Sequence, residues 1–131
     1  MQENLGKLVV RLGVGALLLL HGVHKLLTGI APIKAMVVAH HLPDLVAYGV
    51  YFGEIVGPVL VILGLFARVG GLLIVIDMIF AIVLAGTASL LKLNGSGGYA
   101  LELETLFLLG GLSVMLLGAG RLGLNIGGRW N

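Results

Sequence analysis

Four long apolar stretches alternate with short polar segments along the chain. A helix needs about 20 residues to cross a bilayer core that is roughly 30 Å thick. The stretches therefore predict membrane-spanning helices at about 5–27, 45–66, 69–91 and 99–117. Because only a tight turn at Ala67–Arg68 separates the second stretch from the third, these two helices are expected to run antiparallel. The whole chain is expected to form a single transmembrane domain, an all-α, antiparallel four-helix bundle.

The two longer connections have different characters. Residues 28–44 contain Pro32 and Pro43, and the segment between them, 33–41, is expected to form a short helix at the membrane interface. Residues 92–98 read KLNGSGG, which is the composition of a loop.

The composition agrees with a membrane protein. Of the 131 residues, 59% are hydrophobic and 11% are charged, whereas soluble domains are about 25% charged. The chain has no cysteine, which excludes disulfides and iron–sulfur clusters bound by its own thiolates. A net charge of +2 without a basic block argues against a nucleic-acid partner. The expected partner is the lipid bilayer.

The basic residues indicate an orientation. With four spans, both termini lie on one side of the membrane. Five of the eight lysines and arginines fall on that side: Lys7, Arg11, Arg68, Arg121 and Arg129. Positive residues favour the cytoplasmic side. We therefore expect a multi-pass protein of the inner (cytoplasmic) membrane with both termini in the cytoplasm.

Glycines recur at four-residue spacing in the second stretch, at Gly49, Gly53 and Gly57. Residues four apart share one face of an α-helix. Small residues on such a face let helix backbones approach closely in membranes. The pattern predicts a smooth ridge that faces a neighbouring helix.

Ionisable residues inside the apolar stretches predict a polar pocket in the outer leaflet. His21 and Lys25 are one turn apart on the first stretch, and counting ~1.5 Å per residue places Glu54 at a similar depth. Asp77 lies near the middle of the third stretch. Because lipid offers these groups no hydrogen-bond partner, they should face protein or water. We expect His21, Lys25 and Glu54 to form one connected polar site.

Further members of this site come from the remaining charged residues. Asp77 is one candidate, and the start of the fourth stretch supplies Glu102 and Glu104, between which the sequence leaves the choice open. A second interpretation remains for part of the set. In it, Lys25 reaches the interface, and Glu102 and Glu104 lie at headgroup level. Glu54 and Asp77 are too deep for that and would make only a helix–helix hydrogen bond.

Several short motifs follow one another in a recognisable order. The first stretch has R-L-x-x-G and then HGxxKL, between Arg11 and Leu26. The second has a glutamate and a glycine followed by LGLFAR at Leu63–Arg68, and GxGRL occurs at Gly118–Leu122. Together with Gly97–Gly98–Tyr99, these motifs resemble the DoxX family of small four-helix membrane proteins over nearly the whole chain. The tail departs from the family pattern, with Ala119, Gly123 and Asn125 where proline, serine and aspartate are common.

The resemblance implies a membrane subunit of a quinone-linked redox system, an oxidoreductase component that works with a partner redox protein or as a homo-oligomer. A quinone head group needs an apolar slot with a few hydrogen-bond donors. His21, Lys25 and Tyr99 are the expected donors, and Glu54 is the expected proton relay. The candidate ligand-binding or proton-relay residues are therefore His21, Lys25, Glu54, Asp77, Tyr99, Glu102 and Glu104. No metal ligands are assigned.

The same residues bear on other cofactors and functions. No haem is expected, because the histidines within the spans all lie on the first stretch and cannot ligate from facing helices. The alternative function is a non-enzymatic membrane protein: a carrier, a small-molecule binding protein or an assembly factor. Buried carboxylates beside a lysine suit proton-coupled movement equally well.

Overall fold

A computed structural model describes residues 1–131, apart from the side chain of Thr87. The chain forms five α-helices: α1 (Gln2–Thr28), α2 (Ala31–Ala39), α3 (Gly57–Leu63), α4 (Ala67–Ala85) and α5 (Glu102–Leu117). Shorter helical segments are the 3₁₀ helices η1 (Asp44–Gly49), η3 (Thr87–Ser89) and η4 (Gly128–Trp130), and the π-helix η2 (Phe52–Val56). No strand forms in the described part of the chain, and the predicted all-α class is confirmed.

Three helical units are long and apolar enough to cross a membrane: α1, the continuous segment Asp44–Leu63, and α4. The helix α5 has 16 residues, fewer than the roughly 20 that a bilayer core requires. Three of the four predicted spans therefore meet the length and hydropathy of a membrane helix. The short helix predicted at 33–41 is present as α2 but begins and ends two residues earlier, with Pro32 in its first turn. Its place at the membrane interface stays a prediction.

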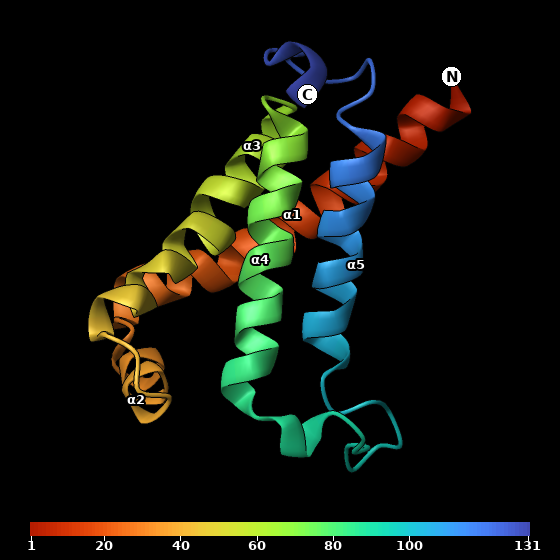
Figure 1. The fold of residues 1–131 in the computed structure, drawn as a ribbon. Helices are drawn as coiled ribbons and strands as arrows, with labels where there is room; N and C mark the ends of the chain where they lie inside the picture. Colours follow the sequence, from red (N-terminus) through yellow and green to blue (C-terminus); the bar gives the residue numbers. More distant parts are fainter.

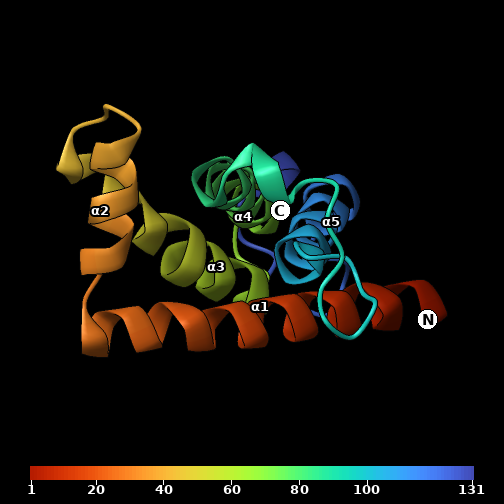
Figure 2. The same cartoon turned by 90° about the horizontal axis from the view of Figure 1, so that it is seen from below.

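The helices pack around a shared core. Figure 2 shows α1 along one side of the molecule, with α3 and α5 packed on it. The helix α4 packs against both α3 and α5 from the other side, and α2 stands apart at the far end of α1 (Figure 1). Leu18, Val61, Ile74, Phe107 and Val114 belong to the buried cluster where these helices meet.

Two predicted boundaries are wrong because glycine or left-handed backbone ends a helix early. The third span was expected to reach Leu91, but α4 ends at Ala85. Gly86 follows with φ of 96°, which an L side chain rarely adopts. The second wrong boundary is the turn expected at Ala67–Arg68. It lies just before these two residues, where Gly64 and Phe66 have φ of 66° and 46°. Its shortness still makes the second and third spans antiparallel neighbours.

The second span changes helix type along its length. Proline lacks an N–H, so Pro58 cannot donate to the carbonyl of Glu54 four residues earlier. Just before it the chain forms the π-helix η2, in which the Gly57 N–H donates to the carbonyl of Phe52. The preceding segment η1 is a tighter 3₁₀ helix. Because these helices have different numbers of residues per turn, a spacing of four does not keep residues on one face here.

The glycine ridge is therefore confirmed for two of its three members. A Cβ at Gly53 would overlap the side chain of Asp77, and a Cβ at Gly57 would lie 3.0 Å from the carbonyl oxygen of Gly70. Both glycines thus permit close contact with α4. The prediction is wrong for Gly49, which has open space around it.

This difference provides a matched pair of variants. Gly53→Ala should lower the free energy of unfolding by roughly 1–3 kcal/mol, because the added methyl overlaps the Cβ of Asp77 and the two segments must separate. Gly49→Ala adds the same methyl in open space and should change stability by less than about 0.5 kcal/mol. Denaturant unfolding of both variants in detergent measures the difference. Equal stability of the two would contradict tight packing between η2 and α4.

Candidate functional site

Lys25 of α1 and Glu54 of η2 form an ion pair inside the molecule. The Lys25 Nζ lies 2.5 Å from both carboxylate oxygens of Glu54. The Glu54 side chain is 7% exposed and that of Lys25 is 25% exposed. Gly22 permits this approach, because a Cβ there would overlap the backbone of Glu54. The pairing predicted from helix depth is present, and its use as a ligand site stays a prediction.

Asp77 of α4 adds an unpaired oxygen beside this ion pair. Its side chain lies against Gly53, the residue before Glu54. The Oδ2 atom is buried, and the described residues give it no hydrogen-bond partner. Buried polar atoms nearly always have a partner, so an exception needs a reason. Asp77 lines the same cavity as Lys25 and Glu54.

A cavity of about 420 Å³ joins these groups. It lies between α2, η1, η2 and the second half of α4. Its ionisable lining residues are Lys25, Glu54, Asp77 and Glu104. Most of the remaining lining is apolar and includes Ile33, Met36, Val50, Phe52, Ile76 and Phe80. The cavity thus offers a large apolar surface with a few charged groups along it.

The structure separates His21 from this cavity. Its side chain is exposed, and its ring packs edge-on against Phe107 of α5, with the ring centroids 5.8 Å apart. The described residues include no hydrogen bond from His21 to Lys25 or Glu54, so the predicted three-residue connection is wrong. The cause is the packing of α1: Gly22 faces η2, which turns the preceding residue towards α5.

The fourth stretch contributes Glu104 rather than Glu102 to the cavity. Glu102 is exposed and accepts a hydrogen bond from Asn94 Nδ2 at 3.2 Å. Tyr99 forms an isolated bridge with Leu93 in the loop before α5 and does not line the cavity. Of the two glutamates that the sequence left open, the structure brings Glu104 to the other carboxyl groups.

Arg11 is the main residue whose role the sequence analysis missed. It was expected among the basic residues of the cytoplasmic side, but it is only 1% exposed. Its Nε donates to the carbonyl of Val61 at 2.8 Å, and its Nη2 donates to that of Ile62 at 2.9 Å. Its Nη1 donates to the carbonyls of Ala119 and Leu122, each at 2.8 Å. The guanidinium therefore joins α1, the end of α3 and the C-terminal segment.

The clue to this role was an arginine within an apolar run. Two glycines leave room for its guanidinium: a Cβ at Gly64 would lie 2.5 Å from Arg11 Nη2, and a Cβ at Gly123 would lie 3.1 Å from the same atom. Arg11 does not line the cavity. It holds together the end of the molecule where the termini lie.

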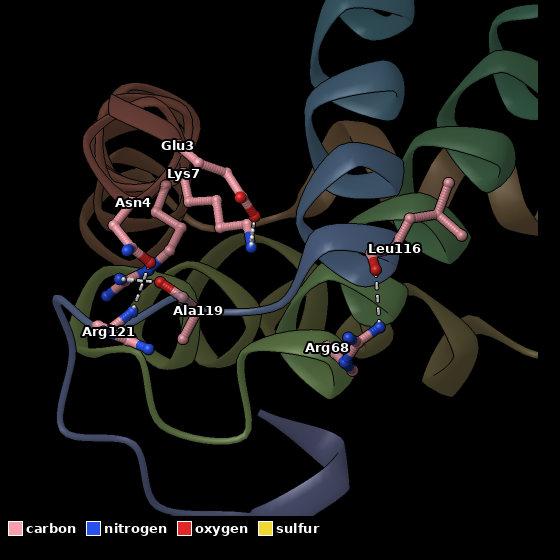
Figure 3. Close-up of polar contacts among 8 residues, drawn as sticks. Glu3, Asn4, Lys7, Arg68, Leu116, Ala119 and Arg121 are labelled. Atoms are coloured by element: carbon pink, nitrogen blue, oxygen red, sulfur yellow. Dashed lines mark hydrogen bonds and ion pairs between the residues drawn. The ribbon is translucent and has the colours of Figure 1, made fainter. Parts of the chain in front are cut away.

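A second arginine closes the end of α5. The last carbonyls of a helix lack partners within it. Arg68 Nη1 donates to the carbonyl of Met115 at 2.9 Å. It also donates to the carbonyl of Leu116 at 2.8 Å, a contact drawn in Figure 3. Figure 3 also shows the start of α1 beside the C-terminal segment, where the Arg121 backbone N–H donates to Asn4 Oδ1 at 3.0 Å.

Comparison with known proteins identifies the family of this chain. The DoxX family model matches residues 6–87, a region that contains Lys25, Glu54, Asp77 and Arg11. No curated protein and no solved structure matches the chain significantly. The matched region is more than half of the sequence and includes all three candidate membrane spans apart from the first residues of α1. The chain belongs to the DoxX family.

Proposed function

We propose that this chain is a membrane subunit of a quinone-linked redox system, and that it holds a quinone or a similar lipid-soluble molecule in the cavity beside Glu54. The observation that carries the proposal is the combination of an apolar lining with the Lys25–Glu54 pair and the unpartnered Asp77 oxygen. Small-molecule sites are mostly apolar, with a few polar groups that orient the ligand. A flat ring with oxygen atoms at its ends suits such a lining.

The size and position of the cavity support a ligand that comes from the bilayer. Its volume of about 420 Å³ lies within the roughly 300–1,000 Å³ of small-molecule pockets. Phe52 and Ile76 line it and are 61% and 55% exposed. Both belong to candidate membrane spans, so the exposed part of the lining that they form is apolar. A lipid-soluble ligand reaches such a lining more readily than a polar one.

In this proposal the chain's own residues orient the ligand and move protons. A bound quinone would supply two-electron acceptor chemistry. Lys25 Nζ donates a hydrogen bond to a ligand oxygen, and Glu54 and Asp77 hold or release the protons that accompany the electrons. Because the chain has no cysteine, we assign the delivery of electrons to a partner redox protein.

The proposal includes the arrangement in the membrane. We take α5 as the fourth span of an antiparallel bundle, since it packs against α1 and α4. We place the protein in the inner membrane with both termini in the cytoplasm. The end of the molecule that holds the termini carries Lys7, Arg68, Arg121 and Arg129, and positive residues favour the cytoplasmic side. Single cysteines at Ser96 and Arg121 should then react with a membrane-impermeant label from opposite sides. Labelling of both from one side would contradict this arrangement.

Filling the cavity tests the binding site. Ala81 lines the cavity, and Ala81→Trp should weaken the binding of a soluble quinone analogue by at least roughly five-fold, since overpacking costs about 1–3 kcal/mol. Calorimetric titration of purified protein in detergent measures the affinity. Ala16→Trp is the matched control, because Ala16 is exposed on α1 and does not line the cavity.

The outcomes separate the proposal from its alternatives. Ala16→Trp should bind the quinone analogue as the unmodified chain does. Equal weakening in both variants, or no quinone binding by the unmodified chain, would contradict a quinone site in this cavity. Proton-coupled uptake by vesicles that contain the protein, without quinone binding, would instead favour a carrier.

A further inference from the structure

A second cavity lies at the other end of α4 from the first. It has a volume of about 360 Å³ and is lined by Arg68, Val69, Leu72, Met115, Arg129 and Trp130. These residues come from the start of α4, the end of α5 and η4. We infer that this cavity binds the headgroup phosphate of an anionic phospholipid, with an acyl chain lying along α4 and α5.

Two arginines supply the positive charge. Arg68 donates through Nε to the backbone oxygen of Asn131 at 3.3 Å, and through Nη1 to two carbonyls at the end of α5. Its Nη2 has no partner among the described residues and is free to donate to a ligand. Arg129 is exposed, and its guanidinium lies 4.9 Å from the centre of the Trp130 ring. A guanidinium presents its donors in a planar fork that matches phosphate.

The surroundings of the cavity favour an anion. Lys7 and Arg121 lie at the same end of the molecule (Figure 3). The acidic side chain drawn there, Glu3, is already paired with Lys7 at 2.6 Å. The carboxyl groups of Glu54 and Glu104 line the other cavity. A phosphate between Arg68 and Arg129 therefore meets excess positive charge.

The apolar wall selects a lipid over a free phosphate. Val69 and Leu72 of α4 and Met115 of α5 line the cavity beside the arginines. Leu72 is 42% exposed and lies one turn further into α4 than Arg68, about 6 Å along the helix. Trp130 is 52% exposed, and tryptophan favours the headgroup level of a membrane. Charge at the rim and apolar surface below it match the two parts of a phospholipid.

The only tryptophan of the chain reports directly on this site. Full-length protein in mixed micelles should show stronger fluorescence quenching of Trp130 by brominated phosphatidylglycerol than by brominated phosphatidylcholine. The ratio of apparent affinities should be roughly five-fold, which corresponds to one arginine acting on an anionic lipid. Arg129→Gln should lower the preference, since only Arg68 then remains beside the phosphate, and Arg129→Lys should keep most of it.

Arg121→Gln is the matched control, since Arg121 is exposed at the same end but does not line the cavity. It should leave the lipid preference unchanged. Equal quenching by the two lipids in the unmodified protein would overturn the inference, and so would an equal effect of Arg121→Gln and Arg129→Gln. Loss of the preference on adding millimolar inorganic phosphate would show a phosphate site instead of a lipid site.

Discussion

Replacing Arg11 with methionine is expected to lower the free energy of unfolding by roughly 3–5 kcal/mol. Four hydrogen bonds to a charged group are lost, each worth about 1.5–3 kcal/mol, but the cost of burying the charge is removed at the same time and offsets part of that loss. The methionine side chain fills much of the same space, so the loss is mainly of hydrogen bonds to the carbonyls of Val61, Ile62, Ala119 and Leu122. Denaturant unfolding followed by circular dichroism in detergent measures it.

Two comparisons identify the cause of this loss. Arg121→Met removes an exposed arginine from the same end and should change stability by less than about 0.5 kcal/mol. Arg11→Lys keeps the charge but replaces the planar fork with a single ammonium, so it should recover only part of the stability. Limited proteolysis of Arg11→Met should cut the segment after Gly118, which the guanidinium no longer holds. A stable, protease-resistant Arg11→Met variant would contradict this role.

Replacing Lys25 with methionine is expected to cost roughly 3–5 kcal/mol, since it leaves the carboxylate of Glu54 buried without its partner. Removing both charges in Lys25→Met/Glu54→Leu should restore much of the stability, because no unpaired charge remains. Glu54→Leu alone should be more destabilising than Glu54→Gln, whose amide still accepts a hydrogen bond from Lys25. Unfolding of the single and double variants in detergent gives the coupling energy.

A double-mutant cycle with Lys25→Met and Glu54→Gln should show coupling beyond about 0.5 kcal/mol. Lys92→Met provides the control, because Lys92 is an exposed lysine in the loop before α5. Combined with Glu54→Gln, it should give effects that add. If the effects of Lys25→Met and Glu54→Gln also add, the contact between these two side chains does not contribute to stability.

The contact between Lys25 and Glu54 was predictable from the sequence because the bilayer leaves few choices. Both residues lie at similar depth on apolar helices, where lipid offers no hydrogen-bond partner. The depth of a residue in the membrane did not predict which neighbouring helix its side chain faces. His21 is four residues from Lys25, yet it packs on Phe107, because the close approach of Gly22 to η2 sets the rotation of α1.

Other features depend on contacts between segments that are distant in the chain. The sequence pattern for Gly49 assumed one continuous α-helix, and the π-helix before Pro58 changes the register. Arg11 was assigned to the membrane edge by a rule that counts charges on short loops. Its four acceptors lie at least 50 positions away, so no local pattern reveals them. The family match covers its position but not the C-terminal acceptors at Ala119 and Leu122.

The separation between Arg11 and its acceptors has a consequence for biosynthesis. A ribosome makes α1 first, and the carbonyls of Ala119 and Leu122 follow 108 and 111 residues later. An arginine at the centre of an inserted helix costs about 2.5–3.5 kcal/mol, and Arg11, which lies nearer the start of α1, has a smaller cost of the same kind while it lacks partners. The nascent chain therefore carries this cost until α3 supplies the first two acceptors, and it is fully relieved only after α5 has been translated. Packing of the helices in the membrane is therefore complete only when the C-terminal segment has taken its place beside Arg11.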